Sequence, residues 1–456
     1  MKFLFLSLFA ACSVLAQAQL SPAITSWLQN TTETGTYYLE GNSTLLENNI
    51  LVNCQKVEYS NDFVYVTATG IPAYPTGPFL DRRNPAFAEN QESIFQIPLN
   101  PTASTGRGDA TVGGNIGIFI NGVAIFDFRD GVAWDPTTQS LCGGPSGPPC
   151  PSTRNDPSDW ARDAILAEMD GFDCSKGHPA DGNYHHHQNP SAFKLDLETV
   201  STVCNLYDAD GLYAIDSTEH APLIGFAYDG FPIYGAYGFA NADGTGGIAR
   251  MQSAYQLRDI TERSTKPDGS ASDLGPDVGG DYFLGYFRED YEFIGDPNND
   301  TVLDEHNGRF CVTPEYPNGT YAYFATVNAD WTSAYPYIVG PTFYGNFERR
   351  DVASINEATT VYEATSSADE VYFTDLNLQV LPNPVSDLVA IQVGGLVQRE
   401  LTLELVGTDG KAFAKTRIPV GGTLAHFDVQ TLYPGTYYIA ISDGVEQTVR
   451  TIIVER

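Results

Sequence analysis

Three adjacent histidines, His185, His186 and His187, stand out in a chain that contains only seven histidines. They lie in DGNYHHHQNP, residues 181–190. In an extended strand, successive side chains point to opposite faces, so His185 and His187 share one face while Tyr184 and His186 share the other. Two residues of strand rise separate the paired rings by about 6.6 Å, and metal–nitrogen bonds of about 2.0–2.1 Å let both imidazoles reach one ion. The spacing therefore predicts a metal-binding pair.

His178 is a candidate third ligand. It precedes a Pro/Asp/Gly turn in KGHPADGNYHHH that would fold it back toward the pair. Three protein ligands leave one coordination position open for water or substrate. Imidazole suits both copper and zinc; zinc activates bound water, and copper binds oxygen or changes redox state. We expect copper or zinc at His178, His185 and His187, and whether a reaction is catalysed stays open.

Four further residues are candidates for the same centre. His306, in LDEHNGRF, stands beside carboxylates, and Glu305 is one of them. Asp229 lies in the turn of YDGFPIYG, where it either shapes the turn or orients a ligand histidine. Tyr184, the neighbour of the histidine run, is a further possible ligand or orienting group.

A separate acidic stretch, GDPNNDTVLDEHNG, spaces Asp296, Asn298, Asp300 and Asp304 like an oxygen-ligand calcium loop. Thr301 occupies the position where an EF-hand loop needs glycine. Calcium is therefore a weaker hypothesis here than an acidic surface turn.

The histidines also have a structural interpretation, in which Tyr, His and Asn side chains hydrogen-bond to one another and to the backbone of a Gly/Pro-rich loop. The corresponding function is a structural or glycan-binding extracellular module. Aromatic side chains such as Trp134, Trp160 and Trp331 would then stack on sugar rings of a cell-surface polymer, although most aromatic residues in such numbers form core.

The N-terminal segment and the net charge limit where this protein can act and which partners it can bind. Residues 1–18 carry one lysine, a short apolar run and Ala16-Gln17-Ala18, which is typical of a cleaved signal peptide. No stretch approaches the length of about 20 apolar residues that a membrane-spanning helix needs. The formal net charge of −33 repels phosphate groups, so nucleic acid and anionic lipid are not expected partners.

Seven cysteines become six once Cys12 leaves with the signal peptide. An even number in an oxidising compartment predicts disulfides. Cys142 and Cys150 flank a Gly/Pro loop that a covalent link would hold closed. The remaining pairs, Cys174 with Cys204 and Cys54 with Cys311, follow by elimination alone.

The elements that must position these residues are predominantly strands, which predicts an all-β fold with few short helices. Twenty-six tyrosines and 25 phenylalanines favour strands, and short β-branched or aromatic runs with Gly, Pro and Asn breaks recur between about 52 and 344. The exception is DPSDWARDAILAEMDGFD, where Asp156 or Ser158 would cap a short helix that ends at Gly171.

Two domains are expected. Residues 19–349 form the large β-rich domain with an N-terminal extension, and 350–378, poor in large aliphatic residues, form a linker. Residues 379–456 alternate apolar and polar positions around Gly/Asp turns, which predicts a small β-sandwich.

The C-terminal segment resembles the type-nine (Por) secretion sorting domain. The resemblance rests on Leu381-Pro382-Asn383-Pro384, on Gly435-Thr436-Tyr437 and on the basic final segment 450–456. It implies passage through the periplasm and across the outer membrane by the secretion machinery. The mature protein would then be secreted or attached to the cell surface, often with the tail removed.

The large domain resembles the YHYH-domain family of secreted proteins. The resemblance rests on ordered segments that include GIFINGVAIFDFRDGVAW, GHPADGNYHHHQNP, IGFAYDGFPIYG and LDEHNGRFCVTPEYPNGTYAYF. Tyr184, His185, His186 and His187 carry the name-giving Tyr-His-Tyr-His motif, with His186 in place of the second tyrosine. The resemblance implies that the histidines, the Asp229 turn and the LDEHNG segment belong to one module, and it implies no particular reaction.

Overall fold

The computed structural model describes residues 20–79, 87–106, 108–111, 113–144, 147–150, 160–191, 211–272, 274–347, 351–363, 378–393, 397, 399–407, 411–443 and 447–455. The chain divides into two compact units, Met1–Tyr362 and Glu363–Arg456, and each is described by itself. The expected signal peptide lies outside the described residues.

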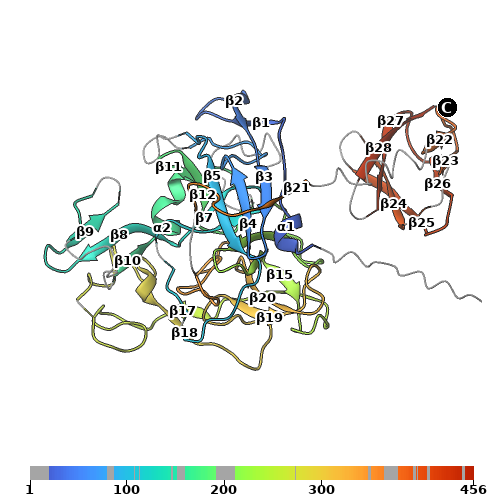
Figure 1. Cartoon of the computed structure of the whole chain (residues 1–456). Helices are drawn as coiled ribbons and strands as arrows, with labels where there is room; N and C mark the ends of the chain where they lie inside the picture. The colour runs from blue at the N-terminus through green and yellow to red at the C-terminus, as the bar shows by residue number, and fades with distance from the viewer. Residues whose placement is uncertain are drawn as a thin grey trace, which may run out of the picture. The chain divides into compact units, whose positions relative to one another are not determined.

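The first unit is built around an eight-stranded mixed sheet (Figure 1). In spatial order its strands are β11 (His178–Ala180), β12 (Asn183–His186), β7 (Ala124–Phe126), β6 (Asn115–Phe119), β13 (Leu223–Ala227), β14 (Pro232–Tyr234), β20 (Thr320–Phe324) and β19 (Gly308–Cys311). The central strands are buried on both faces: every residue of β13, LIGFA, is buried. A strand covered on both sides reads as a continuous apolar run, which explains the sequence of this segment.

A four-stranded sheet packs beside it. Its strands, in spatial order, are β21 (Thr360–Tyr362), β3 (Cys54–Tyr59), β4 (Phe63–Ala68) and β5 (Ser93–Pro98). β21 falls inside the segment that was expected to be a linker, and it pairs antiparallel with β3 through Val361 and Glu58. The exposed edge of β3 supplies backbone partners to a sequence with little apolar character of its own, so composition did not reveal this strand.

Smaller elements complete the first unit. They are the pairs β1 (Thr34–Tyr37) with β2 (Leu46–Leu51), β15 (Tyr237–Phe239) with β16 (Ile248–Arg250), and β17 (Tyr255–Leu257) with β18 (Tyr291–Phe293), the sheet β10 (Ala161–Asp163), β8 (Arg129–Asp135), β9 (Ser140–Gly143), and the short helices α1 (Pro22–Thr25), α2 (Ala164–Glu168), η1 (Met169–Gly171) and η3 (Arg288–Asp290).

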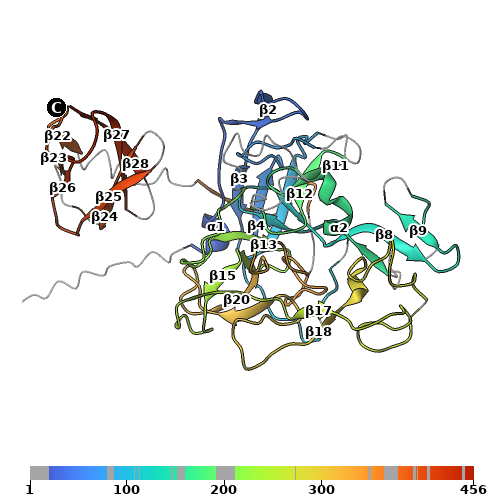
Figure 2. The same ribbon diagram turned by 180° about the vertical axis from the view of Figure 1, so that it is seen from behind.

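The helix expected from Asp156 or Ser158 is shorter than predicted. Ala161–Asp163 form β10 and pair with β8, and α2 begins only at Ala164. The cap is Asp163, whose side chain accepts from the backbone N–H groups of Ile165 and Leu166. The first residues of the predicted helix pair with the edge of β8 as a strand instead, and the Asp163 carboxylate caps the helix where this strand ends. Figures 1 and 2 show α2 between the β11–β12 hairpin and β8.

The disulfide Cys142–Cys150 forms as predicted. Cys174 is also disulfide-bonded, and its expected partner Cys204 lies outside the described residues. The expected Cys54–Cys311 pair is wrong, because both are buried free thiols. Cys54 lies in β3 and Cys311 ends β19, in different sheets. Each serves as a small apolar core residue, a role that pairing by elimination overlooks.

The second unit contains two sheets. The three-stranded sheet orders β22 (Gln379–Leu381), β23 (Leu388–Gln392) and β26 (Leu424–Asp428), and the four-stranded sheet orders β25 (Ala412–Ile418), β24 (Leu401–Gly407), β27 (Gly435–Ser442) and β28 (Gln447–Val454). Buried positions alternate along β24, as LTLELVG predicts, and Leu403 and Ile439 share one apolar core with Val389. Both units are built from strands, so the predicted all-β class is confirmed. Among the described residues, no helix is long and apolar enough to cross a membrane.

Candidate metal centre

A tight hairpin brings His178 opposite His185. Strands β11 and β12 pair antiparallel, with His178 facing His185 and Ala180 facing Asn183. The two residues between them, Asp181 and Gly182, have φ values of 48° and 82°. An Asp-Gly pair with both φ values positive is typical of a type I′ turn, which matches the twist of the two strands. Directly opposed residues lie on one face of the sheet, so this turn puts His178 beside the same-face histidines.

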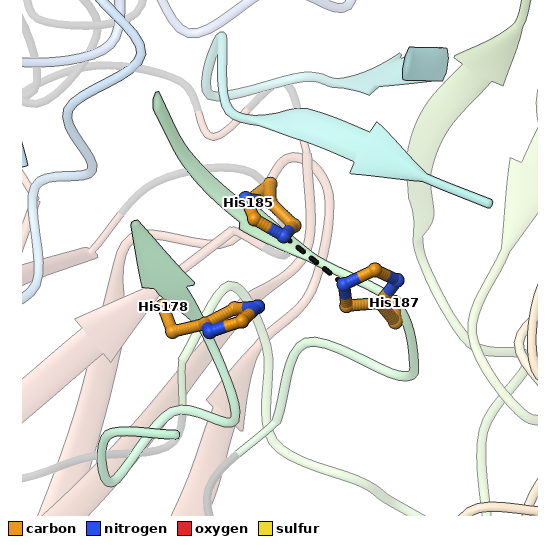
Figure 3. A group of neighbouring side chains, drawn as sticks. All are labelled: His178, His185 and His187. Atoms are coloured by element: carbon orange, nitrogen blue, oxygen red, sulfur yellow. Dashed lines mark hydrogen bonds between the residues drawn. The ribbon is translucent and has the colours of Figure 1, made fainter. Parts of the chain in front are cut away.

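Three imidazoles converge at this hairpin (Figure 3). One nitrogen from each of His178, His185 and His187 lies within 4.8 Å of the others. The Nε2 atoms of His185 and His187 are 3.0 Å apart. The three side chains are buried, with 6%, 1% and 3% of their residue surface exposed. Within the described part of the chain, this is the group of His, Cys, Asp or Glu residues that could hold a metal ion.

A carboxylate that sequence analysis missed completes the cluster. Glu168, the last residue of α2, points its Oε2 atom at the Nε2 atoms of His178, 3.1 Å away, and His187, 3.2 Å away. The sequence contains no motif that joins Glu168 to histidines ten and more residues later. Only the packing of α2 against the hairpin brings the carboxylate to the rings.

The hydrogen bonds of the histidines define which nitrogens carry protons. His185 Nδ1 lies 2.8 Å from the carbonyl oxygen of Asn183, and His187 Nδ1 bonds to the carbonyl oxygen of Asp127. A carbonyl oxygen only accepts, so both Nδ1 atoms must donate. In neutral histidines both Nε2 atoms then carry lone pairs. Two lone pairs face each other across 3.0 Å, an arrangement that is repulsive unless a proton or a metal ion lies between them.

Burial and Glu168 act in opposite directions on the protonation of the rings. Burial lowers the pKa of His185 well below its ordinary value, and the nearby His178 and His187 lower it further. Burial also lowers the pKa of His178, against the smaller raising effect of Glu168. At His187 burial is outweighed by the hydrogen bond and charge of Glu168, which raise its pKa. Conversely, burial alone would raise the pKa of Glu168, but His178 and His187 hold it well below its usual range.

Three of the separations between these atoms are those expected around one small ion. Bonds of about 2.0–2.1 Å put neighbouring ligand atoms about 3.3 Å apart in a tetrahedral site and about 2.9 Å apart in a square-planar site. The measured separations are 3.0 Å for His185–His187, 3.1 Å for His178–Glu168 and 3.2 Å for His187–Glu168. They fall between the two geometries, so these three separations suit zinc and copper(II) alike, and the His178 nitrogen lies within 4.8 Å of the other two imidazole nitrogens.

Comparison with known proteins identifies the family. The model of the YHYH protein family matches residues 94–336, which is 243 of the 456 residues. The chain belongs to the YHYH protein family. The model of the secretion system C-terminal sorting domain matches residues 379–455. This domain directs the YHYH protein to the secretion machinery and hence outside the cell or to its surface.

Other comparisons add little to the family assignment. No curated protein matches the chain. Six chains of solved structures match, and one of them is described as "Biofilm associated protein - BSP domain". This structure is 17% identical with a TM-score of 0.15, and the match covers 31% of the YHYH protein and 23% of the other chain. The YHYH protein thus spans less than a quarter of that chain.

The remaining residues of the YHYH motif lie on the other side of β12. The Tyr184 hydroxyl donates to Asp173 Oδ2 at 2.8 Å, so Tyr184 does not join the three histidines. His186, which replaces the second tyrosine of the motif, lies 2.8 Å from the Tyr74 hydroxyl and packs edge-on to Phe119. Burial lowers the pKa of His186 to about 3. This face of the motif is therefore neutral and packed into the core.

His306 and Glu305 lie away from the histidine cluster. His306 precedes β19, at the opposite edge of the eight-stranded sheet from β11 and β12. Six strand steps of about 4.8 Å separate β12 from β19, which is roughly 29 Å along the sheet. His306 Nδ1 lies 2.7 Å from the Thr342 hydroxyl, and the exposed Glu305 carboxylate is 3.7 Å from its Nε2. The structure does not bring His306 or Glu305 to the cluster.

Asp229 is a buried structural carboxylate. Its Oδ2 atom accepts from the Tyr323 hydroxyl at 2.6 Å and from the Gly345 N–H at 2.8 Å. Burial raises its pKa to about 6, against the lowering effect of these hydrogen bonds. These contacts tie the turn after β13 to the segment after β20, and none of them reaches the three histidines.

The acidic stretch of the calcium hypothesis bonds mainly to the protein itself. Asp304 accepts from the Tyr321 hydroxyl at 2.8 Å, Asp300 from the Ala242 N–H at 2.8 Å, and Asp296 from the Asn298 N–H at 3.1 Å. Asp296 thus shapes its own turn, whereas Asp300 and Asp304 bind other segments of the chain. Calcium at this stretch stays a weak, untested hypothesis.

Proposed function

We propose that this secreted or cell-surface YHYH protein binds one copper or zinc ion through His178, His185 and His187, with the Glu168 carboxylate as fourth ligand. A neutral imidazole is the commonest protein ligand for both metals. The fourth ligand departs from the sequence hypothesis, in which an open position was available for substrate. With four protein ligands the centre is closed, so the proposal is binding and no reaction is assigned.

The observation that carries this proposal is the close approach of the His185 and His187 Nε2 atoms at 3.0 Å. Their Nδ1 atoms are occupied by backbone carbonyls, so both lone pairs point into the same buried space. The backbone thereby holds the tautomer in which the Nε2 lone pair is available to a metal ion, as hydrogen bonds to the other ring nitrogen commonly do for metal-bound histidines. A positive ion between the rings turns the repulsion into two bonds.

The competing explanation is a proton shared by His187, His185 and Glu168. The raised pKa of His187 supports it, because a charged His187 would pair with the Glu168 carboxylate. The two explanations differ in one measurable respect, since only a metal centre retains copper or zinc through purification.

Elemental analysis by inductively coupled plasma mass spectrometry tests the proposal. The full chain is purified from the culture medium or cell surface without a histidine tag or chelator, next to the His185→Ala/His187→Ala double variant. His186→Ala is the matched control, because this side chain is equally buried, lies on the same strand and faces away.

We expect close to one equivalent of copper or zinc in the wild type and in His186→Ala, and none in the double variant. Electron paramagnetic resonance then distinguishes the metals, because copper(II) is paramagnetic and zinc is not. No metal in the folded wild type, even after incubation with either ion, would overturn the proposal in favour of the shared proton.

The sorting domain supports a second proposal. We propose that this C-terminal domain is removed as the protein crosses the outer membrane, and that the mature chain is then released or attached to the cell surface. Mass spectrometry of the extracellular form would test this through its C-terminal residue. An intact Arg456 on the extracellular protein would contradict removal.

A further inference from the structure

A cavity of about 520 Å³ lies beside the proposed metal centre and shares helix α2 with it. Ile165, Leu166 and Met169, next to Glu168 in sequence, line one wall. The other walls come from 250–257 and from 328–337. The volume lies within the range of about 300–1,000 Å³ that is typical of small-molecule sites. The histidine cluster does not line the cavity, so its occupant need not be a metal ligand.

The walls lack acidic side chains although the protein is strongly acidic. Asp and Glu make up 57 of the 456 residues, so 20 wall residues would include two or three by chance, and they include none. The charged wall residues are Lys176 and Arg250. Arg250 also donates to the Val327 carbonyl at 2.6 Å and interacts with the charge of Asp330, which does not line the cavity. Walls with cationic and no acidic side chains favour an anionic group, and guanidinium suits a carboxylate.

The remaining walls combine aromatic faces with neutral hydrogen-bonding groups. Tyr255, Trp331 and Tyr337 are among the aromatic wall residues, and Gln252 and Asn328 are among the amides. Aromatic rings pack against the C–H face of a sugar, and amides satisfy its hydroxyls.

The side-chain N–H group of Gln188, at the cavity wall, is a hydrogen-bond donor without an acceptor among the described residues. It is only 2% exposed, and its Oε1 atom accepts from the Ser333 hydroxyl at 2.6 Å. In the described part of the chain its Nε2 has no hydrogen-bond acceptor. A buried donor without a partner is costly, and an acceptor on a bound molecule removes the cost.

Two large aromatic wall residues have strained backbones. Trp331 has a φ of 69° and Tyr337 a φ of 74°, a region that bulky residues rarely adopt. The turn around Trp331 is held by the Asn328 N–H, which donates to the Thr332 carbonyl at 2.7 Å. The Tyr337 hydroxyl donates to Asp163 Oδ2, at the start of α2, at 2.7 Å. Strain that the surroundings hold in place is concentrated at binding sites, and here it aims two rings at one cavity.

We propose that this cavity binds a hexuronic acid unit, a hexose that carries a carboxylate. Arg250 and Lys176 bind the carboxylate, Trp331 packs on the sugar face, and the amides, Gln188 included, bond to the hydroxyls. The unit is either a free monosaccharide or the end of an extracellular polysaccharide. Of the tryptophans in the glycan hypothesis, Trp134 and Trp160 are buried, with 8% and 1% exposed, so Trp331 is the one that serves this site.

Isothermal titration calorimetry on the full chain tests the proposal, with sodium galacturonate and sodium glucuronate as ligands and glucose as the neutral control. A parallel titration with EDTA present separates this site from the metal proposal, because binding here needs no metal. We expect at least one uronate to bind ten times more tightly than glucose, with or without EDTA. A further titration with polygalacturonate distinguishes a free monosaccharide from a polymer end as the natural ligand. If polygalacturonate binds more tightly per chain end than galacturonate does, the site is assigned to a polymer end.

Trp331→Gly is the informative variant, because glycine removes the ring and accepts the positive φ without strain. We expect uronate affinity to fall at least tenfold in a protein that still folds; its melting temperature should fall somewhat, because the ring packs against Ile215 and Val327. Arg250→Gln is the second variant, and it should lower uronate affinity and leave glucose affinity unchanged. Tyr433→Ala, at an 85% exposed tyrosine of the second unit, is the control that should bind normally.

Three outcomes would overturn the proposal: equal affinity for glucose and both uronates, no heat with either uronate at millimolar concentration, or unchanged binding in Trp331→Gly and Arg250→Gln. Binding of the polymer without binding of any monosaccharide would likewise assign recognition to an extended surface instead of this cavity.

Discussion

The proposed metal centre predicts a ligand-dependent melting temperature that one side chain controls. A ligand at 100 times its dissociation constant stabilises the native state by about 2.7 kcal/mol. The first unit has roughly 340 residues beyond the signal peptide, and an unfolding entropy of about 2.1 cal/mol/K per residue gives about 0.7 kcal/mol/K. Zinc or copper at that concentration should therefore raise its melting temperature by about 4 °C.

His185→Ala should abolish this shift, because it removes a nitrogen that lies 3.0 Å from His187 Nε2. The variant also loses the stacking of the His185 ring on Phe126, with ring centroids 3.6 Å apart. We therefore expect its metal-free melting temperature to fall as well, and only the difference with and without metal is diagnostic. Differential scanning calorimetry of both states, after removal of bound metal, provides the measurement.

His186→Ala is the matched perturbation. It removes a buried ring from the same strand, with Nε2 2.8 Å from the Tyr74 hydroxyl on the opposite face. Its metal-free stability should fall by an amount typical of a core truncation, about 2–4 kcal/mol, but the 4 °C metal shift should remain. A shift that survives in His185→Ala, or disappears in folded His186→Ala, would refute the assignment of the metal ligands to the His185 and His187 face of the motif.

Three further predictions concern the core. Burial raises the pKa of Asp229 to about 6, above its unfolded value of about 3.9, so protonated Asp229 contributes up to about 3 kcal/mol of stability that is complete below pH ~4 and is lost as the pH rises through 6. Urea unfolding at pH 4.5 and 7.5 should show this loss of stability in the wild type and not in Asp229→Asn. Equal losses in the two proteins would contradict the prediction. Gly345→Ala would put a methyl group 2.8 Å from the Phe231 ring and 3.0 Å from Asp229 Oδ2, and it should cost about 1–3 kcal/mol in the same assay, whereas a neutral effect would show that the neighbours move freely. Cys54 and Cys311 are buried thiols whose pKa values burial raises, so a thiol reagent should label them only after unfolding, and rapid labelling of the native protein would exclude this core role.

The class of the fold was accessible from local patterns. Strand segments between Gly and Pro breaks are visible because aromatic and β-branched residues suit a pleated surface. Alternation in LTLELVG has the same cause, since one face of β24 is buried and the other is not. The start of α2 was missed because strand β10 takes the residues that helix propensity alone would assign to the first turn. Long-range pairing overrode local preference there.

Part of the candidate site was also accessible. The Asp181-Gly182 turn and the two-residue spacing of His185 and His187 are local features, and they predict that His178 comes near the pair. Glu168 carries no such signal, because an acidic residue at the end of a helix is common on any surface. His306 was grouped with the cluster on chemistry alone, although the strand order puts it at the other edge of the sheet.

By itself the sequence determined what depends on neighbouring residues: the all-β class, the sorting domain at the C-terminus, the Cys142–Cys150 link and a hairpin that pairs two histidines. The sorting domain follows from its resemblance to a known family, and the other three features need only side-chain alternation, turn geometry or short spacing. Only the tertiary structure decided that Glu168 meets the histidines, that Cys54 and Cys311 stay apart, and that Trp331 faces a cavity. Such contacts join segments far apart in the chain, and their free energy comes from packing that no local pattern encodes.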